Sequence, residues 1–102
     1  MNLEEISFQI ILNGGNARSL AMEAMHHARM NELDLAEQKI EEANEEMRKA
    51  HHFQTDLIQG EARGEKIEIR LLLIHAQDHL MNAITVIDLA KEIIELHKKL
   101  IN

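Results

Sequence analysis

The chain contains no cysteine, no proline and no tryptophan, and its 102 residues include only four glycines and two phenylalanines. The absence of cysteine excludes disulfide bonds and thiolate chemistry. Alanine, leucine, isoleucine, methionine, glutamate, lysine and glutamine dominate instead, and most of these residues lose little rotamer freedom in a helix. The composition therefore predicts an all-α protein.

Positive charge is also scarce, because 11 lysine and arginine residues stand against 18 aspartate and glutamate residues and give a formal net charge of −7. Binding to a nucleic-acid backbone depends on clustered lysine and arginine. Phe8 and Phe53 alone offer no platform on which bases could stack. We expect no nucleic-acid partner.

Long apolar runs are missing too. The longest uninterrupted one, Leu71 to Ile74, is far shorter than the ~20 residues that a membrane-spanning helix needs. The first five residues, MNLEE, lack the basic segment and apolar core of a secretion signal. We expect a soluble, cytoplasmic protein with no direct membrane insertion.

Apolar and small residues recur at spacings of three and four over three segments, at about residues 3–30, 32–60 and 67–100. Asn13-Gly14-Gly15-Asn16 interrupts the first segment and, out of context, would be read as a tight turn. The apolar stripe keeps its phase across this tetrapeptide, so we predict one continuous helix in which the glycines let a neighbouring backbone approach closely. Asn31 is predicted to cap the second helix.

Helices of these lengths are ~42 to 51 Å long, and such rods joined by short loops pack as an antiparallel up-down-up three-helix bundle. We expect residues 1–102 to form a single domain. Before Asp88, however, the third segment carries apolar side chains in nearly every direction, and two sister helices in so small a chain cannot cover them. The sequence therefore predicts self-association through this helix.

Asp78 lies within that apolar segment. It follows Leu71 and Ile74 and precedes Met81 in a three-four repeat that is typical of a seam between helices. An unpaired carboxylate in such a seam would be costly, and it would take up a proton or recruit a cation. Several copies of Asp78 around an oligomer axis could therefore share one metal ion.

His75 and His79 share one face of the same helix, and three interpretations of His75 are open. It could be a hydrogen-bonded core residue. It could ligate a transition metal through the His-x-x-x-His spacing of helical zinc sites, although Ala76 replaces the glutamate that a zinc hydrolase would need. It could be a nucleophile, because neutral imidazole attacks phosphorus. The other histidines are interpreted as surface, cap or packing residues without chemistry: His26, His27, His51, His52 and His97.

Four stretches of the chain carry a family resemblance. They are residues 6–13 (ISFQIILN), 15–21 (GNARSLA), 50–58 (AHHFQTDLI) and 71–81 (LLLIHAQDHLM). Together they resemble the enzyme IIA component of the lactose/cellobiose class of the bacterial phosphoenolpyruvate-dependent sugar phosphotransferase system, and the likeness covers nearly the whole chain.

The resemblance implies a homotrimer of three-helix subunits, that is, a nine-helix bundle. His75 matches the phosphorylated histidine of the family, which accepts a phosphoryl group from HPr and passes it to a cysteine of enzyme IIB. Transfer then continues through the membrane permease IIC to a disaccharide such as cellobiose, lactose or chitobiose. His79 is a candidate supporting residue.

Asp78 matches the family aspartate that meets its symmetry mates around a divalent cation, usually Mg²⁺, with one ion per trimer. A rival from another class is a non-catalytic helical oligomer that binds a transition metal through its seam histidines and Asp78.

Overall fold

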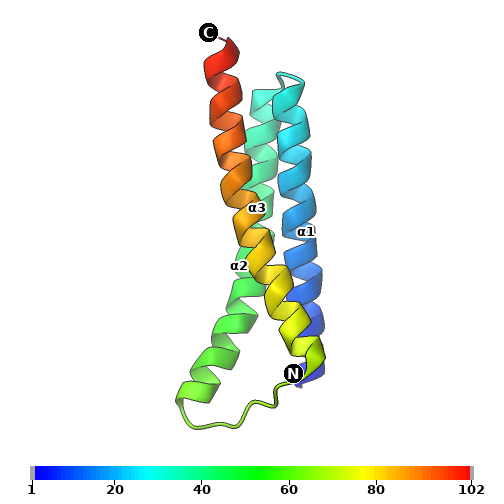
Figure 1. Cartoon of the computed structure of the whole chain (residues 1–102), viewed down its shortest axis with the longest axis vertical. Helices are drawn as coiled ribbons and strands as arrows, with labels where there is room; N and C mark the ends of the chain where they lie inside the picture. The colour runs from blue at the N-terminus through cyan, green and yellow to red at the C-terminus, as the bar shows by residue number, and fades with distance from the viewer. Residues whose placement is uncertain (1, 102) are drawn as a thin grey trace.

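A computed structural model describes residues 2–101 of the chain. Three helices, α1 (Leu3–Arg29), α2 (Leu33–Ala62) and α3 (Leu71–Ile101), form an up-down-up bundle that measures 54 × 20 × 18 Å (Figure 1). Residues 2–101 contain no strand. The prediction of an all-α three-helix bundle is confirmed.

The ends of α1 and α2 are closed by backbone hydrogen bonds around a residue with positive φ. Asn31 (φ 62°) follows α1, and the amide of Glu32 donates to the carbonyl oxygen of His27 at 2.9 Å. Gly64 (φ 94°) likewise follows the last residues of α2. Glycine and asparagine are favoured at this position just after a helix, because it requires a positive φ. Asn31 therefore ends α1, and the expectation that it caps α2 was wrong, because the N-cap of α2 is Glu32.

The third helix begins at Leu71 instead of residue 67. Residues 65–70 adopt no regular structure and run across the base of the bundle from α2 to α3 (Figure 1). An extended residue spans more than twice the 1.5 Å rise of a helical residue. A non-helical link is therefore needed to cover the gap between the two helices at this end.

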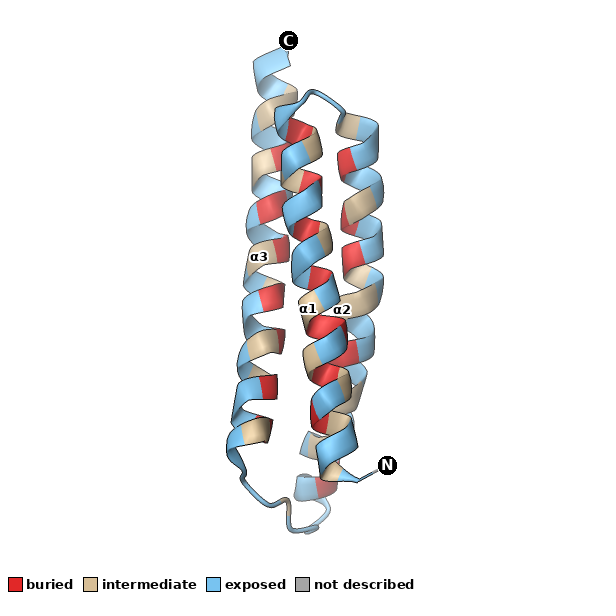
Figure 2. Ribbon diagram, turned by 90° about the vertical axis from the view of Figure 1, so that its right-hand side faces the viewer, coloured by how far each residue is buried: buried red, intermediate tan, exposed pale blue. Residues whose placement is uncertain are grey.

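Small side chains build the core. Alanines face inward on all three helices, and Ile10, Ile40, Leu80, Ile87 and Ile94 fill the space between them (Figure 2). α1 packs closely along both α2 and α3, whereas α2 and α3 contact each other less. The buried alanines are Ala17, Ala21, Ala24, Ala28, Ala36, Ala43, Ala50, Ala76, Ala83 and Ala90.

The glycine pair lies inside an unbroken helix, as predicted. Gly14 is buried against α3, and a Cβ atom added there would lie 3.5 Å from the backbone carbonyl carbon of His79. A Cβ atom added at Gly15 would meet nothing within 4 Å. Gly14 thus permits the close approach of α1 to α3, and Gly15 has no such role in the single chain.

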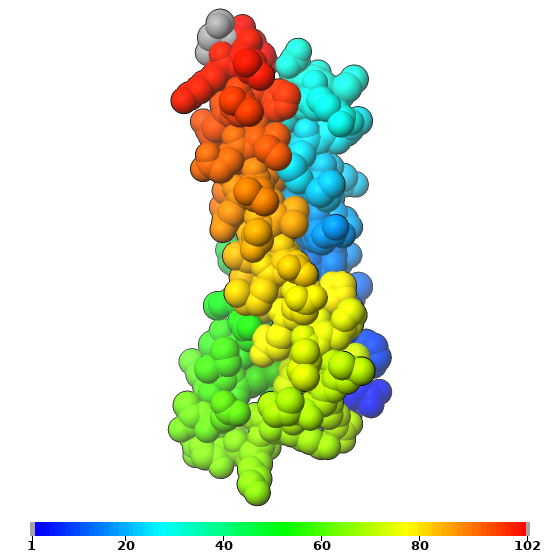
Figure 3. Space-filling view, viewed as in Figure 1, coloured from blue at the N-terminus to red at the C-terminus, as the bar shows by residue number. Residues whose placement is uncertain are grey.

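The chain does not cover the apolar surface of α3. Leu71 is 82% exposed, Ile74 55% and Met81 54%. In Figure 3, α3 extends over the length of the visible face, from yellow to red, beside parts of α1 and α2. Among residues 2–101, none of the helices has the length and apolar character needed to cross a membrane.

The candidate histidine site on α3

The site centres on two imidazole rings. The Nε2 atoms of His75 and His79 lie 3.1 Å apart, and the ring centroids lie 4.5 Å apart with the planes nearly perpendicular. This distance is that of a hydrogen bond, in which the tautomers of the two rings decide which Nε2 donates. The structure therefore brings together the two histidines that the sequence placed on one helix face.

The core holds this part of α3 in place. Ala76 and Leu80 are buried in one core cluster with Ile10 of α1 and Ala50 of α2, which fixes the face of α3 that packs inward. His75 is exposed and His79 is half-buried, with its backbone against Gly14. The interpretation of His75 as a core residue was therefore wrong.

Two glutamines fix α3 to α2 at the same level. The side-chain amide of Gln54 donates a hydrogen bond to the side-chain oxygen of Gln77. α2 and α3 contact each other less than either contacts α1, so this bond limits their separation beside His75. Sequence analysis did not find this pair, because residues 23 positions apart on different helices have no periodic signal.

Asp78 is exposed and lies on the side of α3 next to the histidines. Its Oδ2 accepts a hydrogen bond from the Asn82 amide at 3.3 Å. Within residues 2–101, no three His, Cys, Asp or Glu side chains are grouped so that they could hold a metal ion. The transition-metal alternative, in which the histidines and Asp78 of the chain form a site, is therefore not supported.

A shallow groove of about 370 Å³ borders the site between α1 and α3. His79 forms one edge of the groove and Arg18 of α1 forms another. The lining residues are Arg18, Asp78, His79, Asn82, Thr85 and Val86. Arg18 is far from Asp78 in sequence and belongs to another helix, which is why helix periodicity could not connect it with the site.

The other histidines lie apart from this pair. His26 contacts Arg29 at 3.1 Å, and His27 lies 3.2 Å from a carboxylate oxygen of Glu32 at the end of α1. His52 lies 3.6 Å from the Asp56 carboxylate one turn along α2. For His26, His27 and His52, these contacts agree with the prediction of surface, cap or packing residues.

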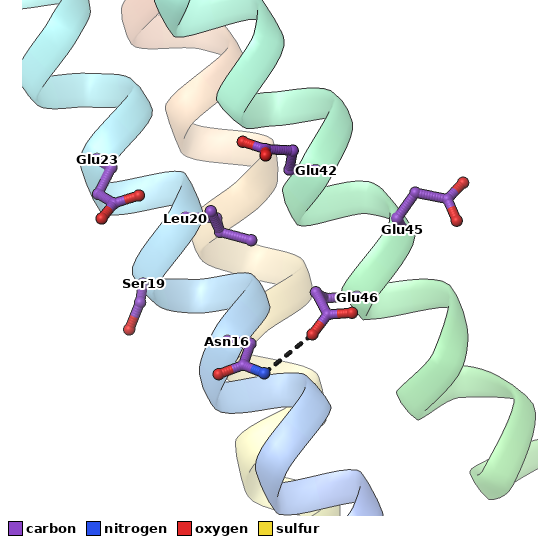
Figure 4. A pocket seen from close by; sticks show the side chains of 7 residues that line it. All are labelled: Asn16, Ser19, Leu20, Glu23, Glu42, Glu45 and Glu46. Carbon is purple, nitrogen blue, oxygen red and sulfur yellow. Dashed lines mark hydrogen bonds between the residues drawn. The ribbon is translucent and has the colours of Figure 1, made fainter.

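A second hollow of about 510 Å³ lies between α1 and α2 and is rich in glutamate (Figure 4). Glu46 accepts a hydrogen bond from the Asn16 amide across it at 2.9 Å and pairs with Lys49 at 2.8 Å. These hydrogen bonds, that from Lys49 first, lower the pKa of Glu46 below its usual value of 4.5. Lys39 lies within 3.6 Å of both Glu23 and Glu42. The carboxylates are therefore occupied by structural pairs.

Comparison with known proteins gives one family over almost the full chain. The family described as "PTS system, Lactose/Cellobiose specific IIA subunit" matches residues 5–98. The lichenan-specific phosphotransferase enzyme IIA component of Bacillus subtilis (strain 168) is 59% identical over 96% of this chain and 89% of its own. The N,N'-diacetylchitobiose-specific EIIA component of Escherichia coli (strain K12) is 41% identical over 96% of this chain and 84% of its own.

Solved structures agree with this. The PTS cellobiose-specific enzyme IIA from Bacillus anthracis superposes with a TM-score of 0.93 at 59% identity, covering 98% of this chain and 93% of its own. The IIA(chitobiose) chain of a IIA(chitobiose)–HPr complex gives a TM-score of 0.87 at 37% identity, with 100% and 99% covered.

These likenesses define the class, which is a phosphocarrier component of a sugar phosphotransferase system. The chain belongs to the lactose/cellobiose-specific IIA family. The resemblance seen in the sequence is confirmed, and so is the phosphocarrier function that it implied.

Proposed function

We propose that His75 carries the phosphoryl group, and that His79 supports it. The observation that carries this proposal is an exposed imidazole whose Nε2 lies 3.1 Å from the Nε2 of a second imidazole. An exposed ring can meet a protein donor. The second ring can donate its N–H to the first, or to a phosphoryl oxygen once the group has arrived.

The transfer needs positioning and charge stabilisation more than covalent machinery. The lone pair of a His75 ring nitrogen forms a bond to phosphorus while the bond between phosphorus and the donor breaks, leaving its electron pair on the donor. In the second step the sulfur of an acceptor thiolate bonds to phosphorus, and the electron pair of the P–N bond returns to the imidazole. His75 is thus first the nucleophile and then the leaving group.

The donor in this proposal is HPr, and the acceptor is a cysteine of enzyme IIB, which serves the membrane permease IIC. The solved IIA(chitobiose)–HPr complex supports HPr as the donor, because the IIA chain there has the same fold over the whole of this chain. Carriage between such partners takes place in the cytoplasm. Two of the relatives are named as specific for the disaccharides cellobiose and N,N'-diacetylchitobiose, which supports a disaccharide such as cellobiose, lactose or chitobiose as the sugar.

The working form in this proposal is a homotrimer. The uncovered apolar residues of α3, among them Leu71, Ile74 and Met81, support it because they need partners outside the chain. The same seam contains Asp78, whose carboxylate is exposed. In a trimer its three copies would converge on the axis.

Magnesium suits this donor set, because carboxylate oxygens are its preferred protein ligands. Asp78 presents one exposed carboxylate per chain, and within residues 2–101 it accepts one long hydrogen bond, the 3.3 Å contact from Asn82. Asp78 of each subunit would hold the ion. When bound, the ion would neutralise the converging charges, and the phosphoryl transfer does not depend on it.

Phosphorylation of point variants tests the assignment. We expect His75→Ala to take up no acid-labile phosphoryl group from phosphoenolpyruvate in the presence of enzyme I and HPr, because the nucleophile is absent. His79→Ala should still be labelled, at a reduced rate, because only the supporting ring is lost.

His52→Ala removes an exposed imidazole on α2 that lies beside Asp56 and the Phe53 ring, on a different helix from His75. It is the control, and it should be labelled like the wild type. Undiminished labelling of His75→Ala would overturn the assignment.

A further inference from the structure

Arg18 has no partner within the part of the chain that the structure describes. No ion pair or hydrogen bond joins it to any of residues 2–101, although it lines the groove beside His79. Every other arginine has a partner. Arg29 contacts His26, Arg48 pairs with Glu45, Arg63 pairs with Glu65 and Arg70 pairs with Glu68.

Asp78 lines the same groove, yet no ion pair joins it to Arg18 within residues 2–101, and its carboxylate accepts a 3.3 Å hydrogen bond from the Asn82 amide instead. The chain as a whole carries a net charge of −7. An unpaired guanidinium in so acidic a protein is therefore available for an anion that comes from outside the chain.

The packing of α1 on α3 places Arg18 in the groove that His79 borders. Gly14 lies against the backbone of His79 and Leu80, so Arg18, one turn further along α1, lies beside the following turn of α3. The two helices run in the same direction (Figure 1). Helical side chains tilt toward the N-terminus of their helix, which agrees with the place of Arg18 in the groove that His79 borders.

We infer that Arg18 binds the non-bridging oxygens of the phosphoryl group while His75 carries it; the inference rests on the phosphocarrier role proposed for His75. A phosphoryl group on the Nε2 side of His75 lies against the His79 ring, since the two Nε2 atoms are 3.1 Å apart. His79 also borders the groove that Arg18 lines. The groove thus receives the phosphoryl oxygens, and Arg18 supplies a cation with a fork of N–H donors suited to them.

Arg18 forms no covalent bond in this role. Phosphoryl transfer spreads negative charge over the equatorial oxygens of phosphorus, and a positioned arginine stabilises that charge. Arg18 also lowers the pKa of the phosphoryl group, because a nearby cation favours the dianion over the monoanion. A residue that only supported the fold would not change this pKa.

Two measurements on Arg18→Gln test the inference. We expect the rate of transfer from phosphorylated HPr to fall on the order of 100-fold, the typical loss when one preorganised donor is removed, with His75 still the labelled residue. In ³¹P NMR titration of the phosphorylated protein, the pKa of the phosphoryl group should rise. Arg18→Lys should restore part of the rate and lower the pKa again.

Arg48→Gln, which removes an exposed arginine of α2 paired with Glu45, is the matched control and should leave both quantities unchanged. Transfer at the wild-type rate by Arg18→Gln, or a slower transfer with an unchanged phosphoryl pKa, would overturn the role of Arg18 while leaving that of His75 intact. Absence of label on His75 in the wild type would overturn the phosphocarrier assignment of His75 and this inference together.

Discussion

At the scale of single residues, α3 separates two kinds of chemistry within one turn. His75 and His79 meet through their Nε2 atoms, whereas Asp78 turns to Asn82. The i, i+4 spacing indicated the first pairing in advance, and the same spacing could have indicated the second. Arg18 had no such signal, because its relation to His79 depends on how closely Gly14 lets α1 approach α3.

Ser7 of α1 has a buried hydroxyl group without a hydrogen-bond partner in the described part of the chain. We expect Ser7→Ala to raise the free energy of unfolding by about 1 kcal/mol, because an unsatisfied buried hydroxyl is removed and alanine favours the helix more than serine does. Urea denaturation followed by circular dichroism measures this.

Ser19→Ala is the control, since Ser19 is an exposed residue of the same helix and its replacement reports helix propensity alone. A loss of stability in Ser7→Ala would contradict the expectation and would show that the hydroxyl is satisfied by water or by another subunit.

At the scale of whole helices, periodicity predicted the elements well and their ends less well. The apolar stripe correctly predicted that α1 continues through Asn13-Gly14-Gly15-Asn16, because the phase of the stripe is a property of the entire helix. The start of α3 was placed several residues early, since residues 67–70 are compatible with a helix locally. Their extended path depends on the separation of α2 from α3 at the base of the bundle, which no local pattern contains.

The pair of Glu46 and Asn16 gives a pH-dependent link between α1 and α2 (Figure 4). The pKa of Glu46 is lowered in the folded chain by hydrogen bonds from Lys49 and Asn16. A lowered carboxyl pKa contributes stability above the unfolded value of 4.5 and loses it as the pH falls through the folded pKa. We expect Glu46→Gln to lose up to about 1 kcal/mol of unfolding free energy at pH 7.

Thermal unfolding at a series of pH values measures this loss, and the difference between Glu46→Gln and the wild type should shrink below pH 4.5. Glu41→Gln removes one charge from an exposed position of the same helix and is the control. A difference that stays constant down to the lowest pH would show that the carboxylate of Glu46 contributes no pH-dependent stability.

At the scale of the whole molecule, the bundle is long and thin, and it leaves much of its apolar surface uncovered. Its extents are 54 × 20 × 18 Å, and Phe8, Leu12, Ile74 and Met81 are each at least half exposed. The sequence indicated this excess because α3 is apolar in nearly every direction before Asp88. It could not indicate the number of partners, since a hydrophobic surface is non-directional and several symmetries can bury it.

The carboxylates of Asp78 provide the sharpest test of the proposed trimer. We expect Asp78→Leu to keep the three-chain mass in analytical ultracentrifugation and to resist dissociation at least as well as the wild type, because apolar contacts replace converging charges that need compensation. Chelation by EDTA should weaken the wild-type trimer and leave Asp78→Leu unchanged. Ile74→Glu, which adds a charge to the same seam, is the control and should dissociate. Monomers of Asp78→Leu would show instead that the carboxylates and their cation are required for assembly, and a monomeric wild type would exclude the trimer.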